Sequence, residues 1–113
     1  MSLEEYFSTG PAHEQPIFEA VMARLRQVGP VHVEPVSVGI FLKRARTFAE
    51  LRPMTKWVAL SFSLPRPTKH RLIKRKITLY NGRYYHVANV ARPEELDQEL
   101  MALVTEAYFC SPE

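Results

Sequence analysis

The spacing of the apolar residues changes near residue 30, and this change limits the chain to folds that combine helices with a sheet. From about residue 14 to residue 28, apolar side chains recur three or four positions apart, which places them on one helical face. From residue 31 to residue 90 the pattern is closer to alternation, and Val, Ile, Phe, Tyr and Thr are frequent, as is typical of strands. The helical repeat returns after Pro93. We therefore predict an α+β fold.

Breaks in the alternating region divide it into strands at about 31–35, 37–43, 55–64, 71–80 and 83–90. Asn81-Gly82 favours a type I′ hairpin turn because both residues tolerate positive φ. Pairing Tyr80 with Arg83 then predicts a core side made of Ile73, Ile77, Leu79, Tyr84, His86 and Val90. The segment 46–53 fits a turn or an edge strand, and as a loop it would be anchored by Phe48 and Leu51. The predicted sheet is mainly antiparallel, has about five strands, and carries the N-terminal and C-terminal helices on one face.

The ends of the helices also have sequence signals. Ser2, with Glu5 three residues later, predicts a capped helical turn at the start of the chain. Gly29-Pro30 ends the helix that begins near Glu14. Pro93 is predicted to begin the last helix, and Ser111-Pro112 to stop it.

Length and composition limit the class of protein. The 113 residues predict a single domain over 1–113. No apolar stretch approaches the roughly 20 residues needed to span a bilayer, and the N-terminal residues are acidic, unlike a secretion signal, so we expect no membrane association. With Cys110 as the single cysteine, no disulfide can form within the chain, and a cytoplasmic location is expected.

Charge is strongly segregated along the chain. Residues 1–30 have a net charge of −2 and residues 93–113 a net charge of −6. Residues 31–92 hold thirteen Lys and Arg against Glu34 and Glu50, which gives a net charge of +11. We therefore predict a basic β region that is flanked along the chain by two acidic helical segments.

Phosphates are the natural partners of such a basic region, and exposed aromatic rings beside the cations can stack on bases. The leading hypothesis is a non-catalytic module that binds nucleic acid or another anionic partner through one sheet face. The residues expected to make the contacts are Lys43, Arg46, Lys56, Lys74, Lys76, Arg83, Tyr85 and His86.

Three alternatives stay open. The cations could form only a solvated face, partly neutralised by the acidic helices. The basic sheet could instead dock an acidic protein partner, or the acidic helices of a second copy in a homodimer. A small-molecule enzyme centred on His86, with Lys43 and Lys56, is the third alternative.

Motifs for metal or cofactor chemistry are missing from the sequence. No His lies at a metal-site spacing from another His or from Cys110, and the scattered glycines form no phosphate-binding loop, so no metal and no cofactor are expected. The predicted register buries His86, where a structural histidine is more common than a catalytic one.

Several segments resemble a family of small bacterial domains of unknown function, whose relatives are labelled predicted transport or nuclease-associated proteins. The segments that carry the resemblance are Phe41-Leu42-Lys43, 46–53, Lys56, 60–64, 86–90, 93–97 and Ala107-Tyr108. The resemblance covers most of the chain. It implies a small α+β module with recurrent positions at Lys43, Lys56 and His86, and it implies no known catalytic residue.

Overall fold

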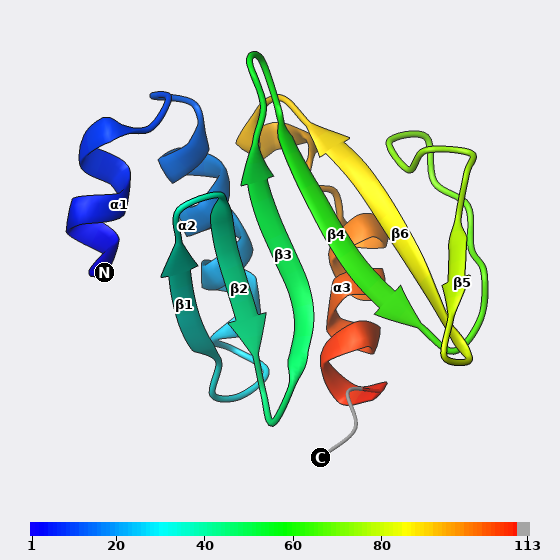
Figure 1. Cartoon of the computed structure of the whole chain (residues 1–113). Coiled ribbons are helices and arrows are strands. Elements are labelled where there is room, and N and C mark those ends of the chain that lie inside the picture. Colours follow the sequence, from blue (N-terminus) through cyan, green and yellow to red (C-terminus); the bar gives the residue numbers. More distant parts are fainter. Residues whose placement is uncertain (111–113) are drawn as a thin grey trace.

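The computed structural model describes residues 1–110 and contains one antiparallel sheet with helices packed on one face (Figure 1). The helices are α1 (Leu3–Thr9), α2 (Glu14–Leu25) and α3 (Gln98–Cys110), with a 3₁₀ turn η1 (Pro93–Glu95) before α3. The strands are β1 (His32–Val36), β2 (Gly39–Lys43), β3 (Thr47–Pro53), β4 (Val58–Leu64), β5 (Thr78–Tyr80) and β6 (Arg83–Val90). Their order in the sheet is β1-β2-β3-β4-β6-β5. The α+β prediction is confirmed, with six strands in place of about five.

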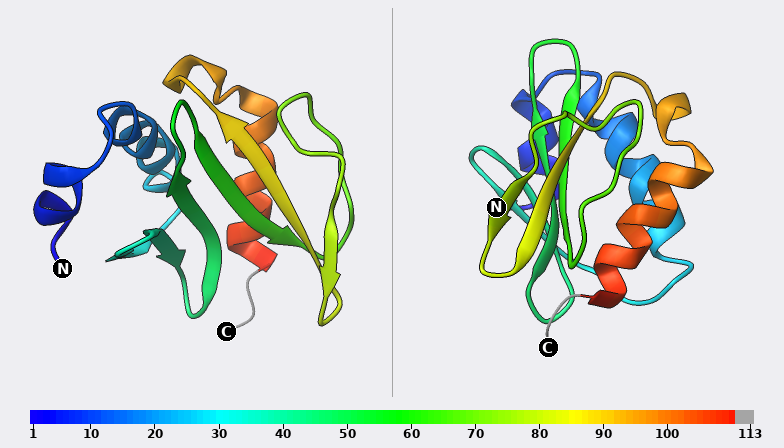
Figure 2. Two further views of the ribbon diagram at one scale, coloured as in Figure 1. Left: turned by 45° about the horizontal axis from the view of Figure 1, so that its top comes forward. Right: turned by 90° about the vertical axis from the view of Figure 1, so that its right-hand side faces the viewer.

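The sheet has a covered face and an open face. Figure 2 shows α2 and α3 side by side on one face, while the other face carries no helix. The apolar stripes of both helices are buried, as predicted, and they meet the inward side chains of β3 and β4, such as Leu51, Leu60 and Phe62. The short helix α1 lies apart from this layer, next to β1 at the edge of the sheet (Figure 1). The open face is therefore the one that no helix of residues 1–110 covers.

The predicted helix ends are confirmed in part: α2 begins at Glu14 as predicted but ends at Leu25, before the predicted stop at Gly29-Pro30. Ser2 and Glu5 form the expected capping box on α1. The last helix begins later than predicted, because the segment that starts at Pro93 makes only a 3₁₀ turn and Leu96 leaves the helical conformation. Asp97 then starts α3, since its Oδ1 accepts a hydrogen bond from the Leu100 amide at 2.8 Å. The predicted stop at Ser111-Pro112 lies outside the described residues.

The segment 47–53 is a central strand, so its interpretation as a turn or an edge strand was wrong. β3 pairs with β2 on one side and with β4 on the other. A bulge hides this strand in the sequence: Leu42 pairs with Ala49 and Lys43 pairs with Thr47, which leaves Phe48 as the extra residue. Phe48 is buried, and its ring centroid lies 5.3 Å from that of Tyr108. Because its neighbour Ala49 is buried as well, the alternation of buried and exposed residues that is typical of a strand is lost.

The predicted strand 71–80 is also wrong over most of its length. Only β5 forms regular pairs, and residues 65–77 form an irregular loop that makes the right-hand border of Figure 1. The hairpin itself is confirmed, with Tyr80 paired to Arg83 and positive φ at Asn81 and Gly82. Leu79 is 59% exposed and does not join the core, because β5 is a three-residue edge strand beyond β6.

Candidate anion-binding site

The loop 65–77, called the basic loop below, holds six cations and no acid. These cations are Arg66, Lys69, Arg71, Lys74, Arg75 and Lys76. The backbone of the loop is tied to β6, because the Lys74 amide donates to the Val87 carbonyl at 2.9 Å and the Asn89 amide donates to the Leu72 carbonyl at 3.1 Å. Ile73, between these two bonds, pairs with Ala88 and is nearly buried. The cations therefore lie on a loop whose position is fixed by the sheet.

His70 anchors the outer part of the basic loop to the helix layer. Its Nδ1 accepts a hydrogen bond from the Leu72 amide at 3.1 Å, so Nε2 carries the proton and donates to the Asp97 carboxylate, also at 3.1 Å. Both ring nitrogens are engaged and the side chain is buried, which makes His70 a structural residue. The pKa of Asp97 is held below its ordinary value mainly by the Leu100 amide, with His70 and Arg71 acting in the same direction.

We expect Asp97→Asn to lower the melting temperature at pH 7 and to match the parent protein in strong acid. The folded-state pKa of Asp97 lies below its unfolded value of about 3.9, so its contribution is present above that value and is lost as the pH falls through the folded pKa. Thermal unfolding at pH 7, 5 and 3 measures the difference. The control is Glu99→Gln, which removes a nearby exposed carboxylate. A difference between parent and Asp97→Asn that stays constant down to pH 3 would contradict the assignment.

The basic loop encloses a hollow with a volume of about 640 Å³, called the loop pocket below. The lining residues are Thr68, Lys69, His70, Arg71, Ile73, Lys74, Arg75 and Ile77. Half of them are Lys or Arg, and no carboxylate lines the pocket. Arg71 has Asp97 at 3.8 Å, but no acid among residues 1–110 lies within ion-pair distance of Lys69, Lys74 or Arg75. The pocket is therefore electropositive and suited to an anion.

A second, shallower hollow of about 290 Å³ lies on the open face of the sheet. It is lined by Glu50, Arg52, Met54, Ala59, Ser61, Lys74 and Val87. Lys74 lines both hollows, so the loop pocket continues onto the open face. Arg52 in this second hollow is partly neutralised, because its guanidinium lies 3.5 Å from the Glu50 carboxylate.

The structure brings only some of the predicted contact residues to this site. Lys74 lines the loop pocket, and Lys76 is exposed two residues further along the same loop. Tyr85 is 41% exposed on β6 opposite Thr78 of β5, and this hairpin directly follows the basic loop. Lys56 is exposed in the turn between β3 and β4, beside the half-exposed Trp57.

Other predicted contact residues lie elsewhere or have partners within the protein. Lys43 forms an ion pair with Glu34 of β1, and Arg46 is exposed in the turn between β2 and β3, on the opposite half of the sheet. The Arg83 guanidinium donates to the Cys110 carbonyl at 2.9 Å and to the Ser63 carbonyl at 3.2 Å, so it ties β6 to the end of α3. These three residues are engaged in the fold or distant from the loop pocket.

His86 is fully buried on the covered face of the sheet. Its ring stacks on that of Phe62, with the ring centroids 5.4 Å apart. Its Nε2 accepts a hydrogen bond from the Thr68 amide at 3.1 Å, and this bond holds the start of the basic loop. Burial lowers the pKa of His86, and the carbonyls of Tyr84 and Phe62 counteract this only in part. Nδ1 makes no hydrogen bond within residues 1–110. His86 therefore supports the candidate site from below and does not line it.

His86, Lys43 and Lys56 do not converge on one pocket. Lys43 pairs with Thr47 at the start of β3, while Lys56 follows the end of that seven-residue strand, so the two lysines lie on the order of 20 Å apart. His86 faces the helices from β6. The geometry that an enzyme centred on these three residues requires is not present.

Sequence reasoning missed Lys69, Arg71 and Arg75 as site residues. The basic run itself was the available signal. Read as a strand, however, the segment placed Arg71 and Arg75 on the same side as Ile73, toward the core, and so removed them from consideration. In the irregular loop that constraint does not apply, and both arginines line the pocket with Lys69.

Two kinds of feature are absent from residues 1–110. Within residues 1–110, no three His, Cys, Asp or Glu side chains are grouped so that they could hold a metal ion. None of the helices there combines the length and the apolar character required to cross a membrane.

A family model described as "Domain of unknown function (DUF5655)" matches residues 3–111. No curated protein and no solved structure matches the chain. The family match includes every helix and strand of the fold as well as the basic loop. The description of the family states no activity.

Proposed function

The chain belongs to the DUF5655 family of domains of unknown function, and on this premise we propose that it binds the phosphates of single-stranded nucleic acid at the loop pocket, without catalysing a reaction. The observation that carries the proposal is the set of cations around that pocket. Lys69, Lys74 and Arg75 are exposed, line one concave surface, and have no acid within ion-pair distance in residues 1–110. Cations without protein partners are the ones that can release counterions from a phosphate backbone.

Aromatic side chains beside the basic loop favour a single strand over a duplex. Tyr80 is 63% exposed and Tyr85 41% exposed, and both belong to the hairpin that follows the loop. Unpaired bases can stack on such rings, with about 1 to 3 kcal/mol for each stacked base, while paired bases in a duplex are already stacked. This role is in keeping with the nuclease-associated label that is expected for relatives. We propose that the protein acts in the cytoplasm.

We expect the affinity for a fluorescent 12-nucleotide single strand to fall with salt, with a slope of log K against log salt between about −2 and −3.5. Each phosphate neutralised on a single strand contributes about −0.7, and three to five cations of the basic loop are available. Fluorescence anisotropy between 50 and 300 mM KCl measures the slope. A slope near zero, or no binding at 50 mM KCl, would falsify the proposal.

Self-association is the competing proposal, because the chain also carries exposed acids before and within α3. Glu94 and Glu99 are exposed in that region, and the basic loop of a second copy could dock there. Sedimentation at 50 and 300 mM KCl separates the two proposals. Dimers that dissociate at high salt, together with no binding of the oligonucleotide, would favour the homodimer.

A further inference from the structure

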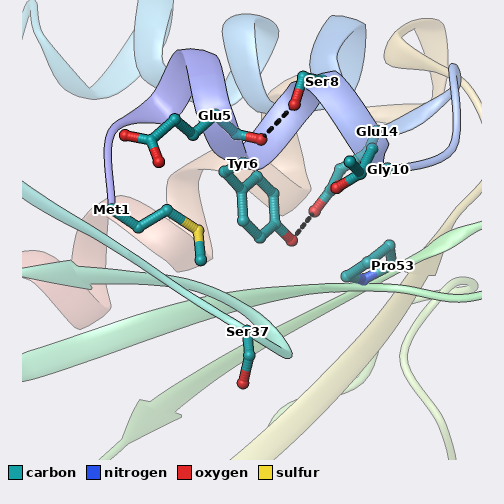
Figure 3. A pocket seen from close by; sticks show the side chains of 9 residues that line it. Met1, Glu5, Tyr6, Ser8, Gly10, Glu14, Ser37 and Pro53 are labelled. Carbon is teal, nitrogen blue, oxygen red and sulfur yellow. Dashed lines mark hydrogen bonds between the residues drawn. The ribbon is translucent and has the colours of Figure 1, made fainter.

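A further pocket lies at the other end of the sheet. The helices and strands that form it are not those that surround the basic loop. It is formed by α1, the start of α2, the turn between β1 and β2, and the end of β3 (Figure 3). Its volume is about 430 Å³, within the usual range for small-ligand sites. The residues that line it are Met1, Glu5, Tyr6, Ser8, Thr9, Gly10, Glu14, Ser37 and Pro53. It is called the α1 pocket below.

Glu14 is a fully buried carboxylic acid in the lining of this pocket. One of its oxygens, Oε2, accepts a hydrogen bond from the Tyr6 hydroxyl at 2.5 Å (Figure 3). The other oxygen, Oε1, is buried and has no hydrogen-bond partner within residues 1–110. A buried acceptor without a donor costs free energy, so its persistence needs a reason other than stability.

The surroundings of Glu14 are acidic and rich in hydroxyl groups. Glu5, Tyr6, Ser8, Thr9 and Ser37 line the pocket, and no Lys, Arg or His is among the lining residues. The adjacent His13 has its Nε2 within hydrogen-bonding distance of the Trp57 carbonyl, at 3.2 Å, and no hydrogen bond joins its ring to Oε1. Burial raises the pKa of Glu14, and the Tyr6 hydroxyl and His13 offset this only in part.

Gly10 leaves space beside the unpaired oxygen. A Cβ atom at position 10 would lie 3.2 Å from Glu14 Oε1, closer than an ordinary contact. The backbone there is extended, with φ of −86°, so a larger residue meets no backbone strain but crowds Oε1, which must then shift. Contact between Oε1 and a ligand in the pocket requires a rotation of the carboxylate, which the soft terminal torsion of a glutamate allows.

From these observations we propose that the α1 pocket binds a primary ammonium group, either of a small amine or of a lysine side chain, with Glu14 as its counter-ion. An ammonium is compact and has three donors, so one can meet Oε1 while another meets the oxygen of the Tyr6 hydroxyl at the same carboxylate. Met1 and Pro53 provide apolar walls for the attached alkyl chain. This inference is independent of the nucleic-acid proposal, since the two sites share no residue.

The test is an NMR titration of the full ¹⁵N-labelled chain with n-butylammonium chloride at pH 8, with n-butanol as the neutral probe of the same shape. We expect saturable shifts of the Gly10 and Ser37 amides with the ammonium and none with butanol. A parallel titration with Nα-acetyl-lysine-N-methylamide distinguishes the sources. Tighter binding than butylammonium indicates a lysine side chain, and weaker binding indicates a small amine.

Glu14→Gln keeps an acceptor for the Tyr6 hydroxyl and removes the charge, and we expect it to weaken butylammonium binding at least about tenfold. The matched control is Glu19→Gln, which removes an exposed carboxylate from the same helix and is expected to leave binding unchanged. Gly10→Ala gives a second test that does not alter the buried acid, and it should weaken binding by crowding Oε1. Equal shifts with butanol, or full affinity in both Glu14→Gln and Gly10→Ala, would overturn the proposal.

Discussion

Replacing Lys69 and Arg75 together by glutamate is expected to lower the affinity for single-stranded nucleic acid by about 50- to 100-fold at 50 mM salt. Two phosphate contacts on a single strand contribute a salt slope of about −1.4, which corresponds to a factor of about 70 between 1 M and 50 mM salt. The new carboxylates add repulsion. Both side chains are exposed and have no ion pair within residues 1–110, so the fold loses little when they are changed. Fluorescence anisotropy at fixed salt measures the affinities.

The matched control for this variant is Arg24→Glu with Arg26→Glu. These arginines are exposed at the end of α2, and the double change alters the net charge of the protein by the same amount. We expect a loss of affinity below about fivefold, because charges away from the contact surface act only through a screened field. Equal losses in both double variants would mean that binding follows net charge, and the loop pocket would then have no special role.

The second large effect is expected for Phe48→Ala, which should lower the free energy of unfolding by about 3 to 5 kcal/mol. Phe48 is 2% exposed, and its ring packs edge-on against Tyr108 of α3. The loss is a large part of the roughly 5 to 15 kcal/mol that stabilises a typical domain. Urea denaturation followed by circular dichroism gives the measurement.

Phe109→Ala is the matched control for Phe48→Ala, because the same atoms are removed from a ring that is 59% exposed and also contacts Tyr108 edge-on. We expect a change of about 1 kcal/mol or less. Phe48→Leu should lie between the two alanine variants, since it retains most of the buried volume. If Phe48→Ala cost no more than Phe109→Ala, β3 would not be the central strand described above.

Much of the fold could be predicted from local patterns. The stripes of α2 and α3, the capping box at Ser2 and the turn at Asn81-Gly82 each depend on residues a few positions apart, and all are confirmed. The predictions that were wrong involve pairing between distant segments. β3 was not recognised as a central strand because the bulge at Phe48 breaks its alternation of buried and exposed residues. The segment 71–77 does alternate and was therefore assigned to a strand, but in the structure it forms no regular strand pairs.

The structure brings together only a few of the residues that were expected to make contacts. Lys74 lines the loop pocket, Lys76 lies two residues further along the basic loop, and Tyr85 belongs to the hairpin that follows it. Which cations remain unneutralised depends on acids brought near by folding. Lys43 has Glu34 as its partner because β1 pairs with β2, and Arg66 has Glu106 at 2.6 Å because the basic loop begins beside α3.

The sequence alone determined the class of fold, the capped start of α1 and the register of one hairpin, since each of these follows from neighbours along the chain. The tertiary structure alone decided that Lys69, Arg71, Lys74 and Arg75 face one hollow, that His86 supports the loop from inside the core, and that Glu14 is buried with one oxygen unpaired. The physical reason is that pairing, burial and neutralisation are properties of contacts between segments many residues apart. A period or a spacing read along the chain does not specify those contacts.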